Sequence, residues 1–171
     1  TLKVEILKIG LAAQAAVVEA PGEGITGLAA QQENTKILSI EDGCAVFSPT
    51  LKLPLKPMIG VIGTAPADES IPTGTPSFHG GNMDCKRIGE GATLYLPVNV
   101  PGALLAMGDL HALMGDGEVC ACGGEIAGAV TVHAEIPGDV SAILRTIREK
   151  GVKAGVSVKP GTPAEAIKEL L

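Results

Sequence analysis

The stretch SFHGGNMDCKRIGEGATLYLPV, residues 77–98, joins a polar loop to a short apolar segment. Gly80 and Gly81 stand side by side in the loop, and glycine reaches backbone angles that other residues avoid, so a tight turn is predicted. Residues 92–98 then read ATLYLPV, an apolar run that is typical of a β-strand. The stretch therefore predicts a strand preceded by a loop that turns its polar side chains inward.

The same alternation of turns and short apolar runs continues along most of the chain. The 23 glycines and 12 prolines among 171 residues favour turns and short strands over long helices. Further strands are predicted at residues 2–9, 15–20, 43–49, 58–66, 103–111, 117–126 and 129–136. The first 136 residues are therefore predicted to form a mainly β domain.

The pattern changes near residue 137 from strand spacing to helix spacing. After Asp139, a good N-cap, apolar residues recur along one face of a helix. Residues 152–158 alternate like a strand, and TPAE at residues 162–165 has the capping pattern of a second helix. Residues 129–171 therefore predict a β-α-β-α unit, and the fold class is α+β overall.

A β-α-β-α unit of this size cannot bury both faces of its own strands. It is expected to dock on the preceding β domain or on another subunit. The predicted domain boundary separates the β domain, residues 1–136, from the C-terminal segment, residues 137–171.

Composition and charge exclude several classes of protein. The net charge is −6, and Lys and Arg form no cluster, so a nucleic-acid partner is not expected. No apolar run is long enough to span a bilayer, so no membrane partner is expected. A cytoplasmic location follows by default.

The apolar fraction of 46% includes no Trp, one Tyr and two Phe, which predicts a core of aliphatic side chains. The four cysteines lack the C-x-x-C spacing of a zinc knuckle. Cys120 and Cys122 lie two apart on a predicted strand. The preferred interpretation is that all four are reduced thiols packed as small apolar groups.

Two clusters of polar side chains contain residue types that bind metal ions or act in acid–base catalysis. The first contains His79, Asn82 and Asp84, and the second contains Asp109, His111, Asp116 and Glu118. Imidazole and carboxylate ligands together suit zinc or a similar divalent ion, which lowers the pKa of a bound water. A carboxylate that is not a ligand could then act as a general base.

The spacing alone leaves a plainer alternative open. Asp-Gly is a common turn pair, and a histidine beside glycines is often an ordinary loop residue. The third histidine, His133, lies on a predicted strand without a clustered partner and is interpreted as a strand residue.

Three long stretches resemble the acetamidase/formamidase family. They are LPLKPMIGVIGTAP at residues 53–66, HGGNMDCKRIGEGATLYLPV at 79–98 and GALLAMGDLHALMGDGEVCACGGEIAG at 102–128. The similarity extends over residues 1–136 and implies a fold of sandwich-like and barrel-like β parts. It also implies hydrolysis of small linear amides, such as formamide and acetamide, to a carboxylate and ammonia. Family members are longer, so the resemblance implies a chain truncated at both ends.

The resemblance also implies roles for the two clusters. It implies a divalent metal ion, zinc or calcium, and a small amide as substrate. The implied metal ligands are His79, Asp84, Asp109 and His111; the implied substrate-binding residues are Asn82, Gly80 and Gly81; and the implied catalytic residues are Glu118, as general base, and Asp116.

The C-terminal segment resembles a different family. DVSAILRTIREKGVKAGVSVKPGTPAEAIKELL, residues 139–171, is similar to the helix, strand and helix around the sixth strand of ribulose-phosphate 3-epimerase, a TIM barrel. VTVHAE at residues 130–135 fits either family. The metal ligands of the epimerase are missing, so its chemistry is not expected here. The chain therefore resembles a chimera of an amidase segment and a barrel fragment.

Two other functional hypotheses stand beside the amidase. In one, the chain is a catalytically silent recombined fold, and its uncovered apolar surface favours a homo-oligomer. In the other, the loop at residues 159–162 binds a phosphate at a helix N-terminus, although a plain connection is preferred for that loop.

Overall fold

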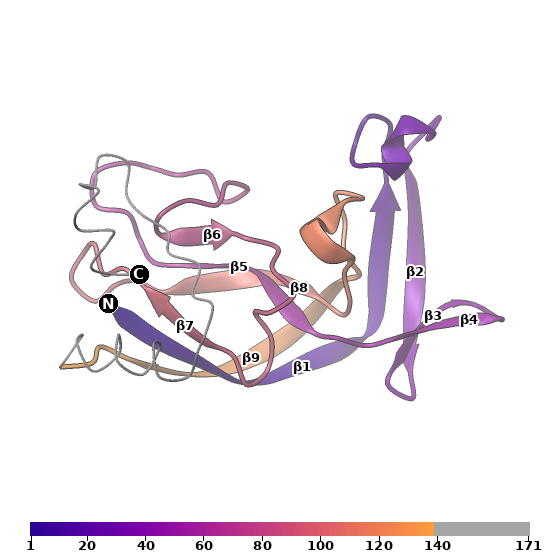
Figure 1. Ribbon diagram of the computed structural model, residues 1–171. Helices are drawn as coiled ribbons and strands as arrows, with labels where there is room; N and C mark the ends of the chain where they lie inside the picture. The colour runs from indigo at the N-terminus through magenta and orange to yellow at the C-terminus, as the bar shows by residue number, and fades with distance from the viewer. Residues whose placement is uncertain (139–171) are drawn as a thin grey trace.

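The computed structural model describes residues 1–138 as one antiparallel sheet with almost no helix (Figure 1). The strands are β1 (Leu2–Glu19), β2 (Asn34–Glu41), β3 (Cys44–Ser48), β4 (Leu51–Pro54), β5 (Met58–Gly63), β6 (Gly80–Asn82), β7 (Thr93–Leu96), β8 (Ala106–His111) and β9 (Glu125–Glu135). Two short 3-10 helices, η1 (Thr26–Leu28) and η2 (Asp116–Glu118), lie in the connections. The mainly β fold predicted for this part of the chain is confirmed.

The strand order is β4-β3-β2-β1-β9-β8-β5-β6, and β7 pairs with the first residues of β1 on the edge opposite β9. The pairs that matter for the site are β5–β8 and β8–β9. They place the end of β8 between β5 and the start of β9.

The first strand is longer than predicted. The sequence predicts separate strands at residues 2–9 and 15–20, whereas β1 is one strand of 18 residues. Its pairing with β9 shifts register twice, between Ile6 and Lys8 and between Leu11 and Ala15. Such irregularities bend a strand without ending it. β1 therefore runs along the lower side of the view in Figure 1 and then bends upward to pair with β2.

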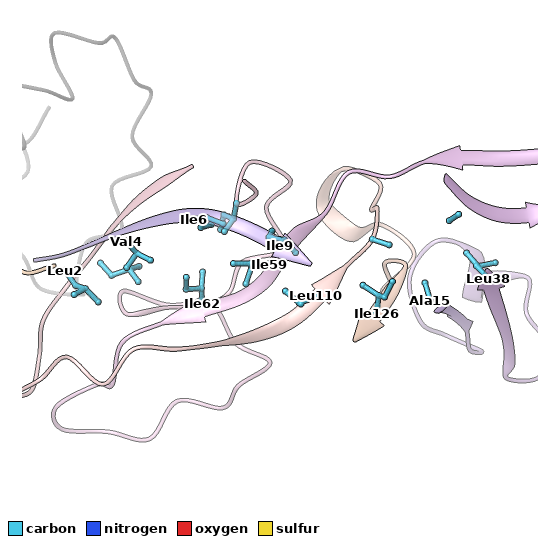
Figure 2. Close-up of a cluster of buried hydrophobic side chains, with 14 of the residues drawn as sticks. Leu2, Val4, Ile6, Ile9, Ala15, Leu38, Ile59, Ile62, Leu110 and Ile126 are labelled. Atoms are coloured by element: carbon cyan, nitrogen blue, oxygen red, sulfur yellow. The ribbon is translucent and has the colours of Figure 1, made fainter. Parts of the chain in front are cut away.

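The core is aliphatic, as predicted. Alternate residues of β1 point to one face, so Leu2, Val4 and Ile6 are all buried. They pack with Ile59 and Ile62 of β5, and Figure 2 shows these side chains in one continuous cluster. Burying one such side chain contributes about 1.5–3 kcal/mol, so this row fixes the strands that position the site.

The prediction of a strand at residues 117–126 is wrong. The segment begins with η2 and continues through turns, and β9 begins only at Glu125. Gly117 and Glu118 both have positive φ, at 66° and 46°, and this backbone conformation ends any extended run. Cys120 and Cys122 therefore do not share the face of a strand, although both are free thiols as predicted.

Three strands, β2, β4 and β6, were not predicted. β2 and β4 are mostly exposed, and β2 buries Leu38 alone among its residues. β2 has no regular apolar alternation, β4 is only the four residues LKLP, and β6 is GGN, so none shows the pattern of a half-buried strand over a useful length.

The predicted C-terminal elements lie outside the described residues. This applies to the helix, strand and helix of residues 139–171 and to the loop at 159–162. The first strand of the predicted β-α-β-α unit is the end of β9, which pairs antiparallel with β1. Within residues 1–138, no helix combines the length and the apolar composition that crossing a membrane requires.

Candidate metal centre

His111 is the central residue of the site. It is the last residue of β8 and pairs with Met58 of β5 on one side and with Glu125 of β9 on the other. Its side chain has no exposed surface. A fully buried imidazole needs partners for its polar atoms, and the surrounding side chains show what those partners are.

Carboxylates surround the Nε2 atom of His111. Glu125 Oε1 lies 3.2 Å from Nε2, Asp109 Oδ1 lies 3.4 Å away and Glu118 Oε1 lies 3.7 Å away. Asp84 is the fourth acid, because it forms with His111 and Glu118 a group whose ligand atoms all lie within 4.8 Å of one another. Asp109, His111 and Glu125 form a second such group.

Three of these four acids have a left-handed backbone. The φ angles are 40° at Asp84, 57° at Asp109 and 46° at Glu118. Residues with a side chain avoid this region, at a cost of about 1–2 kcal/mol for most of them, although aspartate adopts it more readily than most. Such conformations persist where the surrounding fold enforces them, and they cluster at functional sites.

Glycines make room for the acids and for the imidazole. A methyl group on Gly60 of β5 would overlap the Asp109 carboxylate and would lie 2.6 Å from Asp84 Oδ1. A methyl group on Gly123 would overlap the His111 ring. The two aspartates therefore converge over Gly60, and the imidazole lies against Gly123.

The carboxylates govern the protonation of His111. Burial alone lowers the pKa of the imidazole, but the contact with Glu125 and the negative charges of Glu125, Asp109 and Glu118 outweigh burial and raise the pKa to about 9. Without a metal ion, His111 is therefore an imidazolium at neutral pH and balances part of the acidic charge.

The carboxyl groups respond to burial and to one another. Burial, together with the neighbouring acids, raises the pKa of Asp109 and of Glu118. The pKa of Glu125 is lowered: burial opposes this, but the contact with His111 and the N–H of Gly123, which donates to Oε1 at 2.8 Å, prevail. Glu125 is therefore held in its charged form more firmly than Asp109 or Glu118.

The donor spacing fits a divalent metal ion. Tetrahedral zinc ligands at about 2.1 Å from the metal lie about 3.4 Å from one another, and the Nε2–oxygen distances here run from 3.2 to 3.7 Å. Neither His111 Nε2 nor Asp84 Oδ1 makes a hydrogen bond of good geometry within residues 1–138, although both atoms are buried. One imidazole with carboxylates suits zinc, and the surplus of oxygen donors also suits a harder cation.

The structure brings four of the predicted residues together: Asp84, Asp109, His111 and Glu118. Asp116 lies apart from them. Its side chain is 92% exposed, and its carboxylate lies 3.7 Å from the ammonium group of Lys86. The geometry gives no support to a catalytic role for Asp116.

His79 also lies outside both donor groups. It precedes β6 and is buried, with its ring close to the Cα positions of Gly63 and Gly81. The next residues, Gly80 and Gly81, have positive φ and leave no room for a Cβ, because backbone carbonyls of Ile62 and Thr75 fill that space. The packing of β6 against its neighbours therefore accounts for both glycines.

Asn82 lies beside the acid cluster rather than in it. Together with Asp109 it lines an open groove of about 460 Å³, whose apolar wall includes Val61 and Met107. A groove of this size that reaches one of the clustered acids is suited to hold a small organic molecule.

Glu125 is the site residue that the sequence did not reveal. The prediction of a strand over residues 117–126 gives Glu125 no role other than that of a strand residue. A signal was nevertheless present, because Gly123 and Gly124 precede this acid much as Gly80 and Gly81 precede Asp84.

Comparisons with known proteins show which family this chain resembles. Residues 67–153 match the model of the Acetamidase/Formamidase family. The formamidase of Methylophilus methylotrophus is 38% identical over 99 residues, which are 57% of this chain and 23% of that enzyme. The crystal structure of acetamidase from Bacillus halodurans superposes with a TM-score of 0.76 at 54% identity, covering 78% of this chain and 45% of that one. The chain thus spans less than half the length of either relative.

A more distant structure shares the fold. The gamma lactamase from Delftia acidovorans superposes with a TM-score of 0.72 at 22% identity and covers 95% of this chain and 53% of that one.

A second, shorter similarity is to another enzyme. Ribulose-phosphate 3-epimerase of Mycobacterium tuberculosis (strain ATCC 25618 / H37Rv) is 50% identical over 42 residues, which are 25% of this chain and 18% of that enzyme. The family model above spans half of this chain and includes Asp84, Asp109, His111, Glu118 and Glu125 within its match. On this match, the chain belongs to the acetamidase/formamidase family.

Proposed function

We propose that this chain carries the metal centre of an amidase that hydrolyses small linear amides, such as formamide and acetamide, to a carboxylate and ammonia. The observation that carries the proposal is the convergence of four carboxylates on the buried Nε2 of His111. Membership of the acetamidase/formamidase family supports the substrate class.

His111, Asp109 and Glu125 would hold the metal ion, with Asp84 as a further oxygen donor. A divalent cation, zinc or calcium, would supply Lewis acidity, which polarises an amide carbonyl and lowers the pKa of a water molecule. The charged acids and the imidazole are prearranged by the strands, so little reorganisation is needed on binding.

Glu118 is the proposed proton carrier. It lies on η2 at the edge of the acid cluster, and its side chain is 20% exposed, so it can reach both the cluster and a substrate. Burial and the charge of Asp84 raise its pKa, which makes it a better base than an exposed glutamate. It would accept a proton from the attacking water and deliver it to the departing amine.

The groove beside Asp109 would hold the substrate. Its apolar wall at Val61 and Met107 would contact the acyl group, and the amide side chain of Asn82 would orient the carboxamide. Excluding water from this surface strengthens the electrostatic interactions around the reacting carbonyl.

Ammonia release from formamide and acetamide tests the proposal. Protein stripped of metal is assayed alone and after addition of zinc, calcium or manganese. Metal-dependent release should disappear in Glu118→Gln and persist in Glu33→Gln, a matched change at an exposed loop carboxylate. No release from folded, metal-loaded protein would refute the proposal and favour a catalytically silent recombined fold.

We also propose that the chain is a chimera, divided into an amidase-like β domain at residues 1–136 and an epimerase-like segment at 137–171. The epimerase similarity supports this, whereas the family match, which runs to residue 153, weighs against a boundary as early as 137. Deleting residues 139–171 tests it: a separate segment should leave the unfolding of the β domain and its metal binding unchanged. Loss of both would contradict the division.

Self-association is the proposed partner interaction. Ile25, Leu28 and Val119 are exposed by 62%, 83% and 55%, and the first and last of them are joined by a backbone hydrogen bond of 2.7 Å. Apolar side chains gathered in this way favour a protein contact. Light scattering after size-exclusion chromatography should show a dimer or larger species that dissociates in Leu28→Glu. A monomer at all concentrations would refute it.

A further inference from the structure

The second ring nitrogen of His111 has a partner that the proposed mechanism does not use. We propose that Met114 is a positioning residue for the metal-binding imidazole: its thioether accepts the N–H of His111 Nδ1 and leaves the Nε2 lone pair directed at the acid cluster. The inference rests on the proposed metal centre and assigns a role to a side chain that belongs to neither donor group and does not line the groove.

The contact is short and fully enclosed. Met114 Sδ lies 3.3 Å from His111 Nδ1, His111 has no exposed surface and Met114 is 8% exposed. Gly123 lies against the imidazole, because a methyl group there would overlap the ring. The ring is therefore confined by the glycine and its Nδ1 atom is directed at the sulfur.

The backbone holds Met114 in this place. The N–H of Ala112 donates to Gly124 O at 2.8 Å, and the N–H of Gly124 donates to Leu113 O at 2.8 Å. These two hydrogen bonds continue the β8–β9 pairing beyond His111 and tie the segment that leads to Met114 to the strand that carries Glu125.

The chemistry of sulfur fixes the direction of the hydrogen bond. A thioether carries no proton, so in this contact Nδ1 must be the donor. A neutral imidazole has one N–H, and when that proton is on Nδ1 the lone pair is on Nε2. Nε2 is the atom that faces Glu125, Asp109 and Glu118. With a metal ion on Nε2 the ring proton must be on Nδ1, and Met114 is the acceptor for that N–H.

The thioether is a weak acceptor for this task. Metal-binding histidines usually donate their other N–H to a carboxylate, a backbone carbonyl or water, and changing that partner alters metal affinity by about 10–100-fold. A sulfur acceptor polarises the ring less than an oxygen would. The affinity of the centre should therefore fall when the acceptor is removed and recover when an oxygen acceptor replaces the sulfur.

A plain packing role for Met114 makes a different prediction. Leucine fills nearly the same volume as methionine, and exchanging the two in a core usually costs less than about 1.5 kcal/mol. If Met114 only filled space, Met114→Leu would bind metal like the wild type. Met58→Leu is the matched control, because Met58 is also buried and pairs directly with His111 in the sheet.

Zinc affinity, measured by competition with a chromophoric chelator, is the first readout. Met114→Leu should bind zinc about 10–100-fold more weakly than the wild type. Met114→Gln should recover most of this loss through its side-chain carbonyl, and Met58→Leu should match the wild type. The melting temperature of each metal-free variant shows whether it is folded. Wild-type affinity in Met114→Leu, or equal weakening in Met58→Leu, would overturn the proposal.

A second readout does not need bound metal or activity. ¹⁵N NMR of the histidine rings of the metal-free protein is recorded near neutral pH, where both ring nitrogens of His111 carry a proton and the Nδ1–H faces the sulfur. The Nδ1–H resonance should shift in Met114→Leu and stay in place in Met58→Leu. An unchanged Nδ1–H resonance in Met114→Leu would overturn the role of Met114 even if the amidase is active. A shifted resonance without any amide hydrolysis would refute the proposed function alone.

Discussion

Raising the pH of the metal-free protein should destabilise it through one side chain, His111. The folded state raises the pKa of this imidazole from 6.5 to about 9, because the contact with Glu125 and the charges of the surrounding acids outweigh the effect of burial. The folded protein therefore binds a proton more tightly than the unfolded chain does. The resulting stabilisation is fully present below pH 6.5 and is lost as the pH rises from 6.5 to about 9.

The size of the effect follows from the same pKa values. Each tenfold difference in proton affinity is worth about 1.4 kcal/mol, so the free energy of unfolding should fall by about 3 kcal/mol across this window. His111 has no exposed surface, so solvent does not screen the interaction appreciably. For a domain of this size, the melting temperature should fall by roughly 6–12 °C.

Urea unfolding in the presence of a chelator measures the effect. The free energy of unfolding is determined at a series of pH values for the wild type and for His111→Gln, and the difference between them cancels other groups that titrate in the same range. If His111→Gln does not fold, Glu125→Gln serves instead, because it removes the nearest carboxylate and should flatten the profile. A wild-type stability that stays level between pH 6.5 and 9, or that falls equally in the variant, would refute the reasoning.

Three further predictions concern the same centre. Gly60→Ala should push Asp84 and Asp109 apart, lower the free energy of unfolding by about 1–3 kcal/mol and weaken zinc binding at least tenfold. The control Gly10→Ala, where a methyl group would make only an ordinary contact, should change neither quantity. Equal zinc affinities of the two variants would contradict this prediction. The free energy of unfolding of Asp109→Gly should be about 1 kcal/mol higher than that of Asp109→Ala. Both variants lose the carboxylate, but only alanine keeps the strain of the left-handed backbone at this position. Equal free energies of unfolding in urea would show that the backbone at residue 109 is unstrained. Zinc binding at neutral pH should release about one proton from His111. Calorimetry in buffers with different heats of ionisation measures this proton, because the observed binding enthalpy then depends on the buffer. A binding enthalpy that is the same in all buffers would show that the imidazole was already neutral.

The strands that the sequence predicted well are those whose own residues show the apolar pattern of a buried strand. β5, β7 and β8 are short apolar runs bounded by Pro or Gly, so their pattern is visible without knowing what covers them. β2 and β4 are mostly exposed and owe their pairing to β1 and β3, which no local pattern encodes. The division of β1 into two predicted strands failed because register shifts, rather than a turn, accommodate its bend.

The site was predictable to the extent that residue types mark it. The spacing of Asp109 and His111 predicts that their side chains share one face, and in the structure Asp109 Oδ1 lies 3.4 Å from His111 Nε2. Asp84 reaches the same centre while His79 does not, because the direction of each side chain depends on backbone angles such as the positive φ of Asp84. Glu125 is brought to His111 by strand pairing, which the sequence pattern of that segment concealed.

The pairing of β1 with β9 also has a consequence for how this chain folds. Lys3 bonds to Glu135, a separation of 132 residues, and β9 is the strand that carries Glu125. Contacts this distant in sequence close large loops, and chains that depend on them fold slowly. During synthesis on a ribosome, β1 could pair with β9 only after nearly the whole β domain had been made. The acid cluster should therefore assemble as one of the last events of folding, too late for a metal ion to template the sheet.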